Sequence, residues 1–153
     1  MADTNAVVAA AERLRYKDEE ALAIEIGLRS RVIEDDPSAV DNPDLVVQYG
    51  THMGLLDDVK ALGWRILARW NKELHGVVCT SDKADDQEIR TKILSALRID
   101  EMALIAVVAP ALIWLGAPAA IAAAVAPLVV KKFIVPAKEE LCAAWGEAII
   151  GQA

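Results

Sequence analysis

The chain has 153 residues, of which 55% are hydrophobic and 25% are charged. This hydrophobic content excludes a fully disordered chain, because such chains bury too little apolar surface to fold. The net charge of −7 argues against nucleic acid as a partner, since phosphate would be repelled on average. Two cysteines are too few for a disulfide scaffold.

The composition favours helix over strand. Alanine is abundant, whereas phenylalanine occurs once and tyrosine twice, and strands are poor in alanine and rich in aromatic residues. A first helix is predicted over Thr4–Tyr16, with Thr4 as its cap. A second helix is predicted over Glu19–Glu34, capped by Asp18 and ended before Pro37.

The second helix has a rival interpretation as a short strand. Its apolar residues between Leu22 and Leu28 also alternate with period two. Helix is favoured because the charged residues fit one solvated face, made of Glu19, Glu20, Glu25 and Arg29.

The middle of the chain predicts two or three further helices. Asn42–Pro43 is typical of a cap followed by proline at the first helical position. After Gly50 a long amphipathic pattern predicts the central helix of the soluble part, with apolar residues at 3–4 spacing: Leu55, Val59, Leu62, Ile66, Trp70, Leu74 and Val77. Asp85 and Glu88 form a capping box. It opens a helix whose predicted inner face is Ile89, Ile93, Leu94 and Leu97.

Charge divides the chain near Asp100, which is expected to cap the apolar block that follows. Residues 1–101 carry 13 Lys/Arg and 20 Asp/Glu, whereas residues 102–153 carry three of each. Met102–Val130 contains no charged residue and no Ser, Thr, Asn, Gln or His. We therefore expect an acidic amphipathic part over 1–101 and a hydrophobic helical hairpin with a closing helix, opened by Pro136, over 102–153. Both would belong to one all-α helical bundle.

The length of the apolar block predicts a hairpin rather than a straight helix. Its 29 residues would extend about 44 Å in one helix, well beyond the roughly 30 Å core of a bilayer. Gly116-Ala117-Pro118 is the obvious break. The second half can extend beyond Lys131-Lys132 through Val135 if these lysines reach back to a polar surface.

The first functional interpretation of this hairpin is insertion into a lipid bilayer. Basic residues flank it on both sides and would keep both ends in the cytoplasm. Lys131, Lys132 and Trp145 would act as interfacial anchors. The hairpin surface would include Leu104, Val108, Leu112, Trp114, Gly116, Pro118, Ile121, Ala124 and Val125. In layout alone the chain resembles pore-forming colicin domains, which hide an Ala-rich hydrophobic hairpin inside a helical bundle; no colicin sequence motif is present.

Two other interpretations keep the hairpin inside protein. The same residues could form the interface of a homo-oligomer, or they could form the core of a monomer. A monomer core is disfavoured because few helices of a 153-residue domain can be covered on every side.

The chain offers few residues for chemistry. His75 and Cys79 share a helix face at i,i+4 spacing, which can bind zinc. No CxxC or HxxxH motif completes such a site. His52 or Cys142 would have to contribute a further ligand. The cysteines are better interpreted as small buried apolar groups, and a Cys79–Cys142 disulfide is disfavoured in a reducing compartment. No catalytic residue, cofactor or small-molecule substrate is predicted.

A basic and aromatic cluster lies on the long predicted helix. Trp64, Arg65, Arg69 and Lys72 lie close to Lys60 with no acidic residue between. This cluster could meet anionic lipid or an acidic protein partner. The alternative is that Trp64 or Trp70 belongs to the core.

We therefore expect a non-enzymatic helical protein that inserts into or perturbs a membrane through its hairpin. The alternative is a soluble adaptor or assembly module whose hairpin contacts a second copy or a partner. The expected location is the cytoplasm or the inner face of its membrane, because Met1–Asn5 does not begin a secretory signal.

Overall fold

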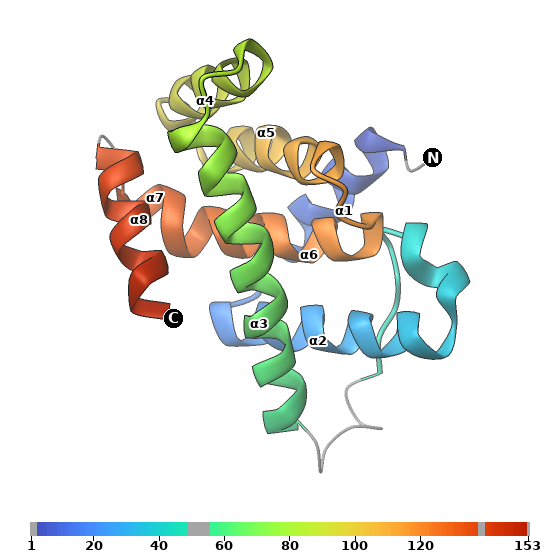
Figure 1. Ribbon diagram of the computed structural model, residues 1–153. Helices are drawn as coiled ribbons and strands as arrows, with labels where there is room; N and C mark the ends of the chain where they lie inside the picture. Colours follow the sequence, from blue (N-terminus) through green and yellow to red (C-terminus); the bar gives the residue numbers. More distant parts are fainter. Residues whose placement is uncertain (1–2, 49–55, 138–139, 153) are drawn as a thin grey trace.

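The computed structural model describes residues 3–48, 56–137 and 140–152, with side chains described up to Ile149. Every regular element in these ranges is helical, which confirms the all-α prediction and excludes the strand alternative for Leu22–Leu28. The elements are α1 (Thr4–Leu14), α2 (Glu19–Asp35), η1 (Pro37–Asp41), α3 (Leu56–His75), η3 (Gly76–Thr80), α4 (Ala84–Leu97), α5 (Glu101–Trp114), α6 (Ala119–Val129), η4 (Val130–Ile134), α7 (Val135–Ala137) and α8 (Leu141–Gln152). Figure 1 shows their arrangement.

Side-chain carboxylates begin several of these helices, as expected from the sequence. Asp18 accepts a hydrogen bond from the backbone N–H of Ala21 (2.8 Å), and Asp100 accepts one from Ala103 (2.8 Å). Each bond satisfies a backbone donor that the first helical turn leaves without a partner. The cap of α1 is Asp3 rather than Thr4.

Two predicted helix starts are wrong. No helix begins at Asn42–Pro43, because the Asn42 side chain accepts from the Asp44 backbone N–H (3.0 Å) and forms a local turn instead. Helix α4 begins at Ala84, ahead of the expected capping box at Asp85. Asp86 bonds to the Ser81 hydroxyl, so the turn before α4 is closed by a different pair of side chains.

Helices α2 and α3 approach each other closely at two glycines. A Cβ atom on Gly63 would lie 1.8 Å from the carbonyl oxygen of Ala23, and one on Gly27 would lie 2.1 Å from that of Val59. Real Cβ atoms essentially never come this close to another atom. Glycine at both positions therefore permits this backbone contact.

This crossing turns the buried face of α3 away from the predicted one. Val59, Trp70 and Leu74 are buried as expected, but Leu62, Ile66 and Val77 are only half-buried. The buried positions between them are taken instead by Gly63, Leu67, Asn71 and, in η3, Val78. Leu55 of the predicted stripe lies outside the described residues.

The predicted hairpin is present, with its tip where the sequence places it. Helix α5 ends at Trp114, and Gly116, two residues later, has a φ of 103° that favours glycine. The N–H of Gly116 bonds to the carbonyl of Ile113 (2.9 Å) and that of Ala117 to Leu112 (2.9 Å), which is the Schellman pattern of a helix end. Helix α6 then returns along α5.

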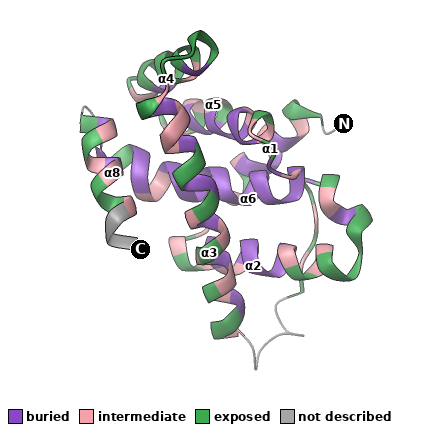
Figure 2. Ribbon diagram, viewed as in Figure 1, coloured by how far each residue is buried: buried purple, intermediate pink, exposed green. Residues whose placement is uncertain are grey.

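Helix α6 is the centre of the bundle. It packs against α1, α2, α3 and α5, and Figure 1 shows it running through the middle of the molecule. Figure 2 shows buried residues along its whole length. The hydrophobic core therefore contains residues of both the acidic and the apolar part of the chain.

Candidate functional site

The hairpin predicted to contact lipid or another subunit lies mostly inside the bundle. Its buried members are Leu104, Val108, Leu112, Ile121, Ala124 and Val125. Three residues at the tip differ: Trp114 and Gly116 are exposed and Pro118 is half-buried. In this conformation most of the hairpin belongs to the core of a single chain, and its tip and part of α5, including Met102 and Ala106, lie at the surface.

The small side chains of α6 explain how so short a chain can cover a helix on all sides. All eleven residues of α6 are buried, and six of them are alanine. Alanine lets neighbouring helices approach closely, so the covered helix occupies little volume. The sequence argument against a monomer core, which rested on chain length, did not include the small volume of alanine side chains.

The apolar helix that follows the hairpin tip extends beyond Val130, where the uncharged block of the sequence ends. It continues without interruption from Ala119 to Ala137, passing through a π-helical stretch at Val130–Ile134. Within the described residues it is the one helix that is long and apolar enough to cross a membrane, and 78% of its apolar stretch is buried. The core helix of a soluble protein can have the same length and composition.

Arg29 fastens the amino-terminal end of α6. Its guanidinium donates to the carboxylate of Glu25 (2.7 Å) and to the backbone carbonyls of Pro43 (2.8 Å) and Ala120 (2.9 Å). Arg29 and Glu25 are 3% and 4% exposed, so the prediction that both lie on a solvated face is wrong. They are buried because each supplies the opposite charge that the other requires.

Two lysines fasten the carboxyl-terminal end of the same helix. Lys131 donates to the backbone carbonyls of Arg15 and Lys17, which follow α1. Lys132 pairs with Glu19 (3.4 Å), and its ammonium lies 5.0 Å from the centre of the Trp64 ring. These predicted interfacial anchors thus make polar contacts with the bundle, and their charged ends stay at its surface.

The basic and aromatic cluster is brought together with Lys132. Trp64, Arg65, Ala68 and Lys132 surround a shallow hollow of about 320 Å³. Arg69 lies over the ring of Trp70 (4.6 Å) and beside Glu73 (3.9 Å), while Lys72 is exposed. Trp70 is buried and Trp64 half-buried, so only Trp64 contributes an aromatic surface to this cluster.

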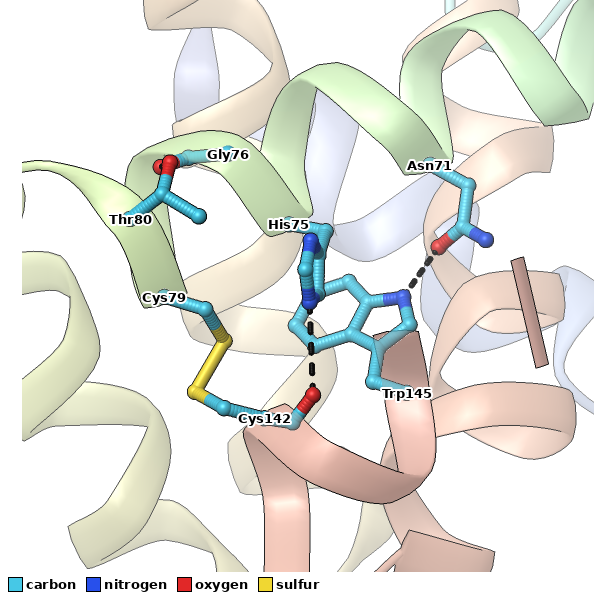
Figure 3. The surroundings of a disulfide bond; sticks show 7 residues. All are labelled: Asn71, His75, Gly76, Cys79, Thr80, Cys142 and Trp145. Atoms are coloured by element: carbon cyan, nitrogen blue, oxygen red, sulfur yellow. Dashed lines mark hydrogen bonds between the residues drawn. A yellow bond between two sulfur atoms is a disulfide. The ribbon is translucent and has the colours of Figure 1, made fainter. Parts of the chain in front are cut away.

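Trp145, the third predicted anchor, lies in the interior rather than at a surface. Its side chain is 0% exposed, and its indole N–H donates to the side-chain oxygen of Asn71 (2.7 Å). The ring of His75 meets it edge-on at 5.3 Å between centroids. Figure 3 shows these three side chains between α3 and α8.

Cys79 and Cys142 form a disulfide, which corrects the prediction that they are separate apolar side chains. The bond joins η3 to α8 next to Trp145, as Figure 3 shows. The two cysteines are 63 residues apart in the sequence, yet the packing of α8 on α3 brings their Cα atoms to 5.5 Å. This is an ordinary separation for bonded cysteines.

The disulfide also bears on the candidate zinc pair. The sulfur of Cys79 is bonded to Cys142, and a cysteine binds Zn²⁺ only as a free thiolate, so the oxidised Cys79 does not provide this ligand. His75 lies near the carbonyl of Cys142 (3.4 Å). Among the described residues no three His, Cys, Asp or Glu side chains gather as metal ligands do; His52 lies outside those residues.

A separate groove of about 890 Å³ lies where α4 and α5 meet α7. Its apolar floor includes Leu94, Leu97, Leu104 and Val135, and Asp100, Glu101, Glu140 and Arg98 border it. The sequence did not single out this groove, because its walls come from segments about 40 residues apart.

Comparison with known protein families, curated proteins and solved structures found no match.

Several of the residues described above were not predicted from the sequence. The pairing of Glu25 with Arg29 has a local signal, since i,i+4 spacing places opposite charges on one helix face. Gly27 and Gly63 interrupt helical patterns, which is a known sign of close backbone approach. Asn71 and Asp86 give no such sign, because their burial depends on distant segments.

Proposed function

We propose that this protein is a non-enzymatic, membrane-active helical protein that shelters its hydrophobic hairpin until the bundle opens. The single observation that supports the proposal is the helix Ala119–Ala137, which has the length and composition of a membrane span but is largely buried within the chain. Its 19 residues extend about 28 Å, close to the roughly 30 Å hydrocarbon core of a bilayer.

The side chains of the hairpin suit lipid as well as they suit the core. Between Met102 and Val130 no side chain carries a charge or a hydroxyl, amide or imidazole group. Transfer to lipid would therefore leave no charged or strongly polar side chain of the hairpin without a partner. The alanines of α6 would also allow close packing against α5 in the membrane.

The polar contacts that hold α6 in the bundle lie at its ends. Arg29 binds at its first turn and Lys131 follows its last α-helical residue, while its middle is held by apolar packing. Release would thus break a few hydrogen bonds and expose apolar surface that lipid can cover. Lys131 and Lys132 lie within the last third of this span, so their side chains would extend toward the headgroups and place their ammonium groups there, beside Trp64 and Arg65.

The tip of the hairpin allows the proposal to be tested without disturbing the core. Trp114 is 56% exposed and Val46, in the segment after η1, is 83% exposed, so aspartate at either position leaves the bundle packed. Aspartate inside a bilayer costs about 2.5–3.5 kcal/mol. We expect Trp114→Asp to weaken binding to vesicles of mixed anionic and zwitterionic lipid at least tenfold, whereas Val46→Asp should change it less than twofold.

The measurement is flotation of the purified chain with these vesicles, together with release of an entrapped dye. Binding that is equally lost in both variants would indicate surface electrostatics rather than insertion. No flotation of the wild-type chain, with its disulfide oxidised or reduced, would overturn the proposal.

A further inference from the structure

Helix α8 is attached to the bundle along one narrow face. It packs against α3, α7 and η4. Only Leu141 and Trp145 are buried among its residues up to Ile149, while Ala143, Glu147 and Ala148 are exposed. Its apolar attachment therefore depends chiefly on these two side chains.

The binding site of Trp145 on α3 is partly polar. The indole N–H has its partner in Asn71, but the side-chain nitrogen of Asn71 is buried and has no hydrogen-bond partner among the described residues. A buried donor without a partner costs free energy. Gly146 of α8 lies next to the His75 ring, since a Cβ atom there would be in ordinary contact with the ring nitrogen at 3.4 Å. The noncovalent attachment is close-fitting but not optimised for stability.

The covalent attachment lies one helical turn from this contact. Cys142 precedes Trp145 by three residues, and its disulfide partner Cys79 follows His75 by four. Both cysteines are only half-buried, so a small thiol can reach the bond. In a reducing compartment, disulfides are typically transient or redox-sensing.

Helix α8 covers part of the apolar helix Ala119–Ala137. It packs against η4, which continues α6 and carries the buried side chains of Phe133 and Ile134. Loss of α8 from this position would uncover the carboxyl-terminal third of the helix Ala119–Ala137. That segment begins at Lys131 and Lys132, the lysines expected to meet lipid headgroups.

We propose that Cys79–Cys142 is a reversible redox site that fixes α8 over η4 when oxidised and allows α8 to detach when reduced. The step that follows detachment, entry of the hairpin into lipid, rests on the proposed function. The reductant is a dithiol. One of its thiolates attacks a sulfur of the disulfide and forms a mixed disulfide, and its second thiol then displaces the remaining cysteine. The products are the two cysteine thiols and the cyclic disulfide of the reductant.

The first experiment measures amide hydrogen exchange in the oxidised chain and after reduction with dithiothreitol, without lipid. We expect exchange in 141–152 to accelerate at least tenfold on reduction, and exchange in α1 and α2 to change less than twofold. The double variant Cys79→Ser/Cys142→Ser should exchange like the reduced chain, with no response to dithiothreitol. Unchanged exchange in α8 of the reduced wild-type chain would overturn the inference.

A second variant, which keeps both cysteines, tests the noncovalent contact. Trp145→Phe removes the N–H that Asn71 accepts but retains an aromatic ring. It should accelerate exchange in α8 in the reduced chain and have little effect in the oxidised chain. An equal effect in both states would contradict a disulfide that fixes α8.

Vesicle flotation separates this inference from the proposed function. Tighter binding of the reduced chain, by at least tenfold, supports both. Detachment of α8 with no binding in either state supports the redox site and overturns the proposed function. Binding that is equal in both states, with α8 exchange unchanged, overturns the redox site and leaves the proposed function supported.

Discussion

Arg29 shows how one buried charged side chain joins three parts of the fold. Its guanidinium contacts the carboxylate of Glu25 within α2, the carbonyl of Pro43 after η1, and the carbonyl of Ala120 in α6. A buried ion pair is weak evidence for stability, because desolvation offsets much of its attraction. The role of this ion pair is to position one helix relative to another, since Arg29 aligns the first turn of the apolar helix with α2.

We expect Arg29→Leu to destabilise the chain by about 3–5 kcal/mol, because it removes the nearer cation from a buried carboxylate. Lys17, whose ammonium lies 4.0 Å from the other oxygen of Glu25, would be the cation left beside it. The double variant Glu25→Leu/Arg29→Leu should recover part of this loss. Urea unfolding followed by circular dichroism measures both, and a double variant less stable than Arg29→Leu would contradict the argument.

The contact between α2 and α3 is decided by glycine rather than by large apolar side chains. At Gly63 and Gly27 the backbone of one helix lies against the backbone of the other. The atoms that an added methyl group would meet are carbonyl oxygens, which cannot move aside as a flexible side chain can. The two helices would have to separate.

We expect Gly63→Ala to destabilise the chain by about 3 kcal/mol or more, at or above the upper end of the range typical of forced overpacking, because the methyl group would meet backbone atoms. Gly76→Ala is the matched control, because its nearest new contact would be the Thr80 hydroxyl at 3.8 Å. Alanine is the better helix former, so the control should be neutral or stabilising by up to about 1 kcal/mol. Thermal unfolding compares the two, and equal melting temperatures would show that the helices can separate at little cost.

The hairpin tip depends on glycine for a different reason. A Cβ atom on Gly116 would meet nothing within 4 Å, but the φ of 103° is one that other residues rarely adopt. The restriction is therefore on the backbone and not on space. This is why the tip could be located from the sequence, whereas Gly27 and Gly63 indicate a close approach without indicating which helix they meet.

At the scale of the whole molecule, the apolar hairpin is covered within a single chain. The bundle leaves exposed only the tip of the hairpin and part of α5. A homo-oligomer built on the buried residues of the hairpin would have to open the bundle first, whereas one built on the exposed tip would not. The groove beside α7 is larger than the hollow between Trp64 and Lys132.

We expect the oxidised chain to be a monomer in solution without lipid or detergent. Light scattering after size exclusion should give a mass near 16.5 kDa. A mass of twice that value, independent of dilution over the micromolar range, would favour the alternative assembly module. The Trp114→Asp variant identifies the surface involved, because a dimer formed through the hairpin tip should dissociate.

The sequence by itself determined the features that depend on a few neighbouring residues. Asp18 and Asp100 cap helices because a carboxylate reaches the backbone N–H groups three residues on. The break at Gly116 follows from the backbone freedom of glycine. The all-α class and the apolar hairpin follow from composition and helical spacing, which also act over a few residues.

Only the tertiary structure decided which surfaces are buried and which residues meet. The partners of Arg29 lie as far as 91 residues away, and the cysteines pair across 63 residues. On α3, Val59, Trp70 and Leu74 of the predicted apolar stripe are buried, but Gly63, Leu67 and Asn71 are buried beside them where α2 and the core helices pack. Helical periodicity shows which apolar residues share one face of a helix, but burial of that face depends on the shape of every helix packed against it.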